Sequence, residues 1–94
     1  MIYKLTRTNR KTGLTITAIC EEYNSGVFIV KAGSIISPYE LKGLSKRMKE
    51  IRDNAPIDRN HVLLEDMSFN SLYDAACFVI GTNANEKWFV PMEV

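Results

Sequence analysis

The sequence predicts a small α+β domain in which an antiparallel sheet of about five strands packs with two helices, in the order β-β-β-α-β-α-β. Alternating and β-branched residues dominate the first 30 positions, a helix-start pattern follows at residue 37, and a complete helix with both its ends falls near residues 71–81. Ninety-four residues suffice for one hydrophobic core, so we expect residues 1–94 to form a single domain.

The first three strands are expected at residues 3–8, 14–22 and 27–30. Gly13 lies in the turn between the first two, and the second alternates apolar with polar residues, which predicts a hairpin with one buried face. The third reads Val-Phe-Ile-Val without alternation, as is typical of a central strand covered on both faces. These three strands should form an antiparallel meander.

Residues 37–40, Ser-Pro-Tyr-Glu, have the form of a capping box with proline at the first helical position, so we expect the first helix to start there. It should end before Pro56. The residues expected on its buried seam are Leu41, Leu44, Met48 and Ile51. Those expected to share its opposite face are Lys42, Lys46 and Lys49.

A short strand is expected at residues 61–65 and a turn at 66–70, and the second helix follows at residues 72–80. Ser71 is placed to accept from the backbone N–H of the third residue after it, and Gly81 suits the left-handed conformation that ends a helix. The helix is apolar on most of its circumference, so it should lie in the core.

Two adjacent small residues, Ala75 and Ala76, should let the second helix approach the sheet closely. Residues 87–90, Lys-Trp-Phe-Val, are expected to form the last strand, and Pro91 suits a strand end or an edge.

The composition is that of a soluble globular protein, with 46% hydrophobic and 24% charged residues. No apolar run approaches the roughly 20 residues that span a bilayer, and the N-terminus has no apolar signal stretch, so we expect a cytoplasmic protein without a membrane partner. Cys20 and Cys77 are too few for a disulfide scaffold and lie among apolar residues, which favours two buried thiols.

Charge is unevenly distributed along the chain. Residues 1–52 hold ten Lys or Arg and four Asp or Glu, a net charge of +6, whereas residues 53–94 hold two and seven, a net charge of −5. Either the basic half meets nucleic acid while the acidic half meets something else, or the two halves neutralise each other across the fold.

Catalytic signatures are absent from the sequence. His61 is the only histidine and has no spacing motif with a serine or thiol, and Glu65 and Asp66 are adjacent on an expected strand end, so they should point in opposite directions. There is no zinc-ligand spacing and no phosphate-binding glycine loop. We therefore expect a protein that is not an enzyme and that holds neither a cofactor nor a metal.

A run in the last third of the chain resembles a domain of unknown function found C-terminal to GIY-YIG nucleases and in restriction-modification proteins. A similar signature occurs in the restriction-enzyme adenine-methylase-associated domain. The matching residues are Phe28, Val30, Ala32, Gly33, Ser34, Ala75, Ala76, Val79, Gly81, Asn85 and Trp88, so the resemblance covers about residues 27–90. The chain departs from the pattern at Leu72, where proline is usual, and at Glu86, where glycine is usual. The resemblance implies an accessory domain without the nuclease.

Candidate binding residues fall in three groups, each with a structural alternative. The residues are Arg7, Arg10 and Lys11 near the first turn, Lys42, Lys46 and Lys49 on the expected helix face, and Asn83, Asn85 and Trp88 in the last loop. The cations can contact phosphates or can simply be solvated. The asparagines can bond a base or can hold their own loop, while the indole contacts a base or closes the core.

These observations and the resemblance lead us to expect a non-catalytic binding module that engages DNA or a DNA-modifying or restriction complex. Two alternatives from other classes remain. One is an inhibitor, of phage or mobile-element origin, that binds a host defence protein. The other is an oligomerisation module that uses an uncovered strand edge.

Overall fold

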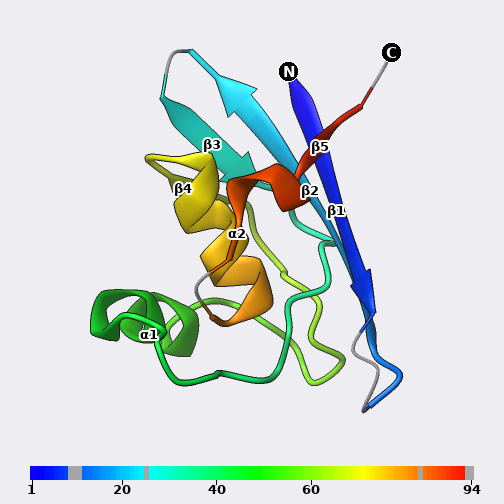
Figure 1. The fold of residues 1–94 in the computed structure, drawn as a ribbon, viewed down its shortest axis with the longest axis vertical. Coiled ribbons are helices and arrows are strands. Elements are labelled where there is room, and N and C mark those ends of the chain that lie inside the picture. Colours follow the sequence, from blue (N-terminus) through cyan, green and yellow to red (C-terminus); the bar gives the residue numbers. More distant parts are fainter. Residues whose placement is uncertain (9–11, 25, 83, 93–94) are drawn as a thin grey trace.

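The computed structural model describes residues 1–8, 12–24, 26–82 and 84–92 and contains one five-stranded antiparallel sheet of order β4-β3-β2-β1-β5 with two α-helices (Figure 1). The predicted α+β class and order of elements are confirmed. No α-helix in the described part has the length and apolar character that a bilayer span requires. The elements are β1 (Ile2–Thr8), β2 (Thr15–Tyr23), β3 (Val27–Val30), α1 (Lys46–Asp53), β4 (Met67–Phe69), α2 (Leu72–Ile80), the 3-10 turn η1 (Glu86–Trp88) and β5 (Val90–Pro91).

The predicted meander of β1, β2 and β3 is present. Leu5 lies opposite Ala18 in the β1–β2 register, and both side chains are fully buried. The expectation that β3 is covered on both faces is wrong, because Val27 is 39% exposed although Val30 is fully buried. In Figure 1, α2 lies against one side of the sheet and α1 lies beyond α2, so neither helix covers the other face.

Helix α2 is the core helix that the sequence predicts. The Ser71 hydroxyl accepts from the Asp74 N–H at 3.0 Å, and Gly81 ends the helix with φ of 84°. Ala75 and Ala76 are fully buried, and the helix packs on β2, β3 and β4. The small side chains allow this close packing.

Helix α1 begins later than the sequence predicts. Ser45 is its cap and accepts from the Met48 N–H at 3.1 Å, whereas the expected start at Ser37 forms no helix. The Ser37 hydroxyl accepts instead from the N–H of Tyr39, only two residues on, at 3.2 Å. This bond closes a tight turn in an irregular segment, residues 37–41, which we call the 37–41 loop.

The late start changes the predicted seam of α1. Met48 is buried and Ile51 is half-buried, but Leu41 lies before the helix and is 62% exposed. Helix α1 packs against α2, which separates it from most of the sheet.

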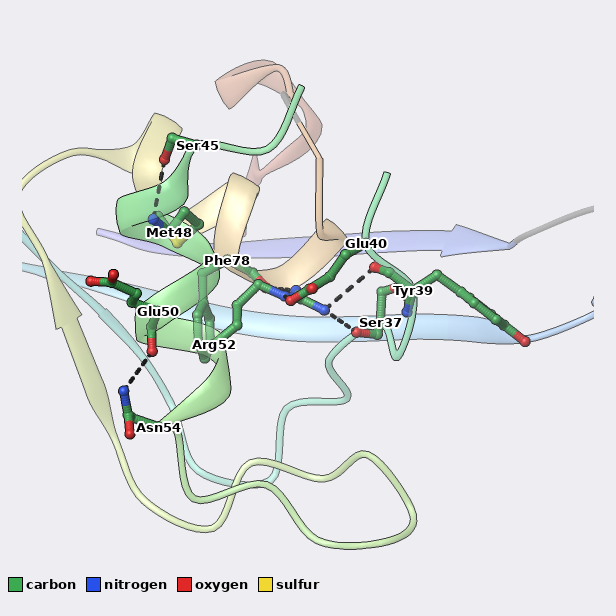
Figure 2. A network of polar contacts seen from close by, with 9 residues as sticks. All are labelled: Ser37, Tyr39, Glu40, Ser45, Met48, Glu50, Arg52, Asn54 and Phe78. Carbon is green, nitrogen blue, oxygen red and sulfur yellow. Dashed lines mark hydrogen bonds and ion pairs between the residues drawn. The ribbon is translucent and has the colours of Figure 1, made fainter. Parts of the chain in front are cut away.

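A buried arginine joins α1 to α2 and to the 37–41 loop (Figure 2). The guanidinium of Arg52 donates to the backbone oxygens of Phe78 and Ser37 and, at 3.4 Å, to that of Tyr39. Its Nε donates to the Glu40 carboxylate at 3.1 Å. Phe78 lies in the last turn of α2, where carbonyl oxygens have no partner within the helix, so Arg52 provides a charged cap for that end.

The 37–41 loop bonds two further carbonyl oxygens at the end of α2. The Ser37 N–H donates to the Val79 oxygen at 2.8 Å, and the Leu41 N–H donates to the Gly81 oxygen at 3.0 Å. A Cβ atom on Gly81 would lie 2.0 Å from the Tyr39 oxygen. Because the backbone N–H groups of Ser37 and Leu41 are hydrogen-bonded to α2, the loop does not form the helix that the capping box predicts.

The prediction of a strand at residues 61–65 is also wrong. Val62 and Leu63 form only isolated bridges, with Ile35 and Ile57 respectively, and His61 has a φ of 66°, which regular strands do not accommodate. Strand β4 forms later, within the segment expected to be a turn.

Asp66 fixes the approach to β4. Its carboxylate accepts from the Ala32 N–H at 2.8 Å and from the Lys31 ammonium at 3.0 Å. The hydrogen bond from the Ala32 N–H, and after it the hydrogen bond from the Lys31 ammonium, lower the pKa of Asp66. The stabilisation is therefore present at neutral pH and is lost as the pH falls through the lowered pKa.

We predict that Arg52→Ala lowers the free energy of unfolding by about 3–5 kcal/mol, because it leaves buried carbonyl oxygens and the Glu40 carboxylate without a partner. The matched control is Arg47→Ala on the same helix. Its pair with Asp74 is formed by an Arg47 side chain that is 65% exposed, so it should cost at most about 1 kcal/mol. Urea unfolding of both variants measures the difference, and equal midpoints would contradict the role of Arg52.

Gly81→Ala should destabilise the protein far more than Gly13→Ala. Both glycines have a positive φ, 84° and 74°, but only at Gly81 does a Cβ meet another atom within 4 Å. Gly13→Ala should cost only the backbone term of about 1–2 kcal/mol. Thermal unfolding followed by circular dichroism distinguishes them, and similar melting temperatures would mean that the 37–41 loop yields to the added methyl group.

Candidate functional site

Two residues from different groups of candidates, Arg7 and Trp88, lie together. The guanidinium carbon of Arg7 is 3.8 Å from the centroid of the Trp88 ring, which is well within cation–π distance. Arg7 is exposed and Trp88 is half-buried. The ring thus supports a cation that faces solvent. We call these residues the Arg7–Trp88 pair.

The sheet register explains where the indole lies. Val90 of β5 pairs with Lys4 of β1, so continuing this antiparallel register places residue 88 beside Thr6, beyond the end of β5. Lys4, Thr6 and Trp88 line one surface depression, in agreement with that register. Trp88 therefore flanks the edge of β1 that β5 is too short to cover.

Asn85 holds the turn that carries Trp88. Its side-chain oxygen accepts from the Lys87 N–H at 2.9 Å, and its backbone oxygen accepts from the Trp88 N–H at 3.0 Å. Both bonds agree with the interpretation in which the asparagine holds its own loop. The strand predicted at residues 87–90 is wrong in its first half, because Glu86–Trp88 forms a 3-10 turn. Asn83 lies outside the described residues.

The basic candidates on α1 and in the loop before it do not join the Arg7–Trp88 pair. Lys46 and Lys49 are exposed on α1, but Lys42 lies in the loop before it, so the three lysines do not share a helix face as predicted. In Figure 1, α1 and β1 lie on opposite sides of α2. Arg10 and Lys11 are outside the described residues.

Ion pairs partly neutralise the two halves of the chain. Lys31 pairs with Asp66 at 3.0 Å and Arg47 with Asp74 at 3.1 Å, and both pairs join the basic half to the acidic half. Within residues 1–8, 12–24, 26–82 and 84–92, Arg7 has no carboxylate at ion-pair distance. Its charge is therefore available to an external anion.

A cavity of about 170 Å³, separate from the depression beside Trp88, is lined by Arg7 and Thr8 of β1. Tyr39 and Leu41, from the 37–41 loop, form part of its wall, and Ile16 and Ile80 contribute apolar side chains from β2 and α2. The sequence did not reveal this cavity because Tyr39 and Leu41 were assigned to a helix. Their exposure, 46% and 62%, is a property of the loop conformation.

Both cysteine thiols of the chain are buried. Burial, with a smaller effect from the charge of Glu22, raises the pKa of the Cys20 thiol to about 12, so the thiol is protonated at neutral pH. Cys77 is a buried free thiol. Among the described residues, no group of three or more His, Cys, Asp or Glu side chains forms a potential metal site.

The chain matches no protein-family model, and no curated protein or solved structure matches it.

We predict that Asn85→Ala lowers the free energy of unfolding by about 1 kcal/mol, since it removes the side-chain bond to the Lys87 N–H. Asn70→Ala, at an exposed position before α2, serves as the control and should change the free energy of unfolding by less than about 0.5 kcal/mol. Any loss of ligand binding by Asn85→Ala should follow its lower melting temperature. A fully stable Asn85→Ala variant without binding would instead assign the asparagine to recognition.

Proposed function

We propose that this chain is a non-catalytic binding module for nucleic acid and that the Arg7–Trp88 pair is its principal phosphate contact. The observation that carries the proposal is the exposed guanidinium, held 3.8 Å above an indole ring, with no carboxylate partner in the described residues. A cation held in this way is suited to binding an anion from outside the protein.

Stacking favours phosphate binding for a geometric reason. The guanidinium is planar, and its N–H groups point outward in that plane, where they can bond two phosphate oxygens at once. An indole face restricts the plane without using these donors. Arg7 therefore loses less side-chain freedom on binding than an unsupported arginine or lysine would.

Two further groups of β1, Lys4 and Thr6, lie near Trp88 but on the opposite face of the strand from Arg7, because successive side chains of a strand alternate. Lys4 is exposed and lines the depression beside Trp88 together with Thr6, whose hydroxyl is another donor for a phosphate oxygen. Contacts of this kind bind the backbone without reading sequence, and their strength falls as salt rises.

The biological setting that we propose is DNA modification or restriction, with DNA or a DNA-modifying complex as the partner. The resemblance of residues 27–90 to the domain found with GIY-YIG nucleases supports this setting. An inhibitor of a defence protein is the competing function, and binding experiments with DNA separate the two.

The test is a fluorescence anisotropy titration of a labelled DNA oligonucleotide with the parent protein, Arg7→Gln and the control Lys49→Gln. Both substitutions remove one positive charge, but Lys49 lies on α1, across α2 from β1. We expect Arg7→Gln to weaken binding by about tenfold and to lower the salt slope by about 1. Lys49→Gln should change the affinity by less than about twofold.

Two results would overturn the assignment. A greater loss with Lys49→Gln than with Arg7→Gln would place the phosphate contact on α1. An absence of DNA binding by the parent, together with capture of a nuclease or methylase subunit by the same protein, would favour the inhibitor function.

A further inference from the structure

We propose that the cavity beside Arg7 receives one unpaired base of a nucleic-acid strand while Arg7 holds a phosphate of the same strand. We call it the base pocket; its walls include Arg7, Thr8, Tyr39, Leu41 and Ile80. This inference rests on the proposed function. It specifies the class of ligand, which is single-stranded or locally unpaired nucleic acid.

Size limits what the base pocket can hold. Its volume of about 170 Å³ is below the roughly 300 Å³ at which sites for drug-sized ligands begin. A single planar ring is the kind of group that a hollow of this size accommodates. Bases within a duplex are stacked and paired, so only an unstacked base can enter.

The walls are chemically suited to a base. Ile16 is buried and Ile80 is half-buried, and together they provide apolar surface. Tyr39 is 46% exposed and its hydroxyl has no hydrogen-bond partner among the described residues. Aromatic rings exposed in this way stack on bases of any identity. Thr8 also lines the cavity, and its hydroxyl, which shares a hydrogen bond with the Thr15 hydroxyl at 3.0 Å, provides a polar group for a base edge.

The base pocket is rigid on the side where the base would stack. The 37–41 loop that carries Tyr39 and Leu41 is bonded at both ends to the end of α2, and Arg52 bonds its backbone between them. A wall that is already ordered adds little entropy cost on binding. The buried Arg52 network thus has a functional consequence, since it holds Tyr39 in place.

Charge complementarity selects the occupant. The acidic side chain of the 37–41 loop, Glu40, is paired with Arg52, so it does not neutralise Arg7. A suitable ligand therefore carries an anionic group, which pairs with the Arg7 guanidinium, next to a planar ring, which stacks on Tyr39. A nucleotide combines these two groups at adjacent positions.

Three labelled probes of equal length test the inference with the intact protein: single-stranded DNA, the same strand with abasic sugars, and duplex DNA. The abasic strand keeps the phosphates but has no bases. We expect the parent to bind the single strand about tenfold tighter than either other probe, because base stacking is lost in both. This comparison needs no variant, so a misfolded mutant cannot obscure it.

Tyr39→Ala and the control Tyr23→Ala locate the stacking ring. Tyr23 is similarly exposed, at 42%, but lies at the end of β2 remote from Ile16. Tyr39→Ala should reduce single-strand affinity by about five- to tenfold and leave abasic and duplex affinity unchanged. Tyr23→Ala should change none of the three, and Arg7→Gln should weaken all three.

The outcomes separate the inference from the proposed function. Equal affinity of the parent for all three probes, with Arg7→Gln still weakening them, would overturn the base pocket and leave the proposed function standing. Binding to none of the probes would overturn both. A single-strand preference that Tyr39→Ala does not alter would also overturn the assignment of the base to this pocket.

Discussion

The contact on which the rest of the structure depends is the buried guanidinium of Arg52. It bonds a carbonyl in the last turn of α2, two carbonyls of the 37–41 loop and the Glu40 carboxylate, so three segments meet at one side chain. Burying a charge is costly unless its donors are satisfied, and here they are supplied by carbonyls that a helix end leaves unpaired. The arrangement fixes α1 against α2 and also rules out helix in the loop, because the loop backbone faces α2.

The same constraint reaches the surface where we place the function. Gly81 has no side chain and allows the Tyr39 carbonyl to approach the end of α2 closely. Tyr39 is consequently held beside Arg7, which is itself held by Trp88. A buried polar network and an exposed cation are thus connected through one short loop. The network uses the backbone of the loop whereas the proposed base pocket uses its side chains, so a change of the Tyr39 side chain leaves the hydrogen bonds of the network in place.

Several residues on which the proposed resemblance to the nuclease-associated domain rests have identifiable structural roles. The Ser34 hydroxyl accepts from the Ile19 N–H at 3.1 Å, Gly81 takes a positive φ, and Asn85 holds the turn of Trp88. Each role requires a small or hydrogen-bonding residue at that position. Glu86, where the pattern has glycine, is compatible with this turn because it begins a 3-10 segment. The departure from the pattern therefore leaves the Asn85 cap intact.

By itself, the sequence determined the features that depend on neighbouring residues. Helix α2 has the predicted bounds because its cap joins Ser71 to Asp74 and its end requires only the φ of Gly81. The hairpin of β1 and β2 follows from alternation in the same way. The tertiary structure decided that α1 starts at Ser45 and not at the predicted Ser37, because the Ser37 backbone is bonded to α2. It also decided the candidate site: Arg7 meets Trp88 only through pairing of β1 with β5, a contact between the two ends of the chain that no local pattern specifies.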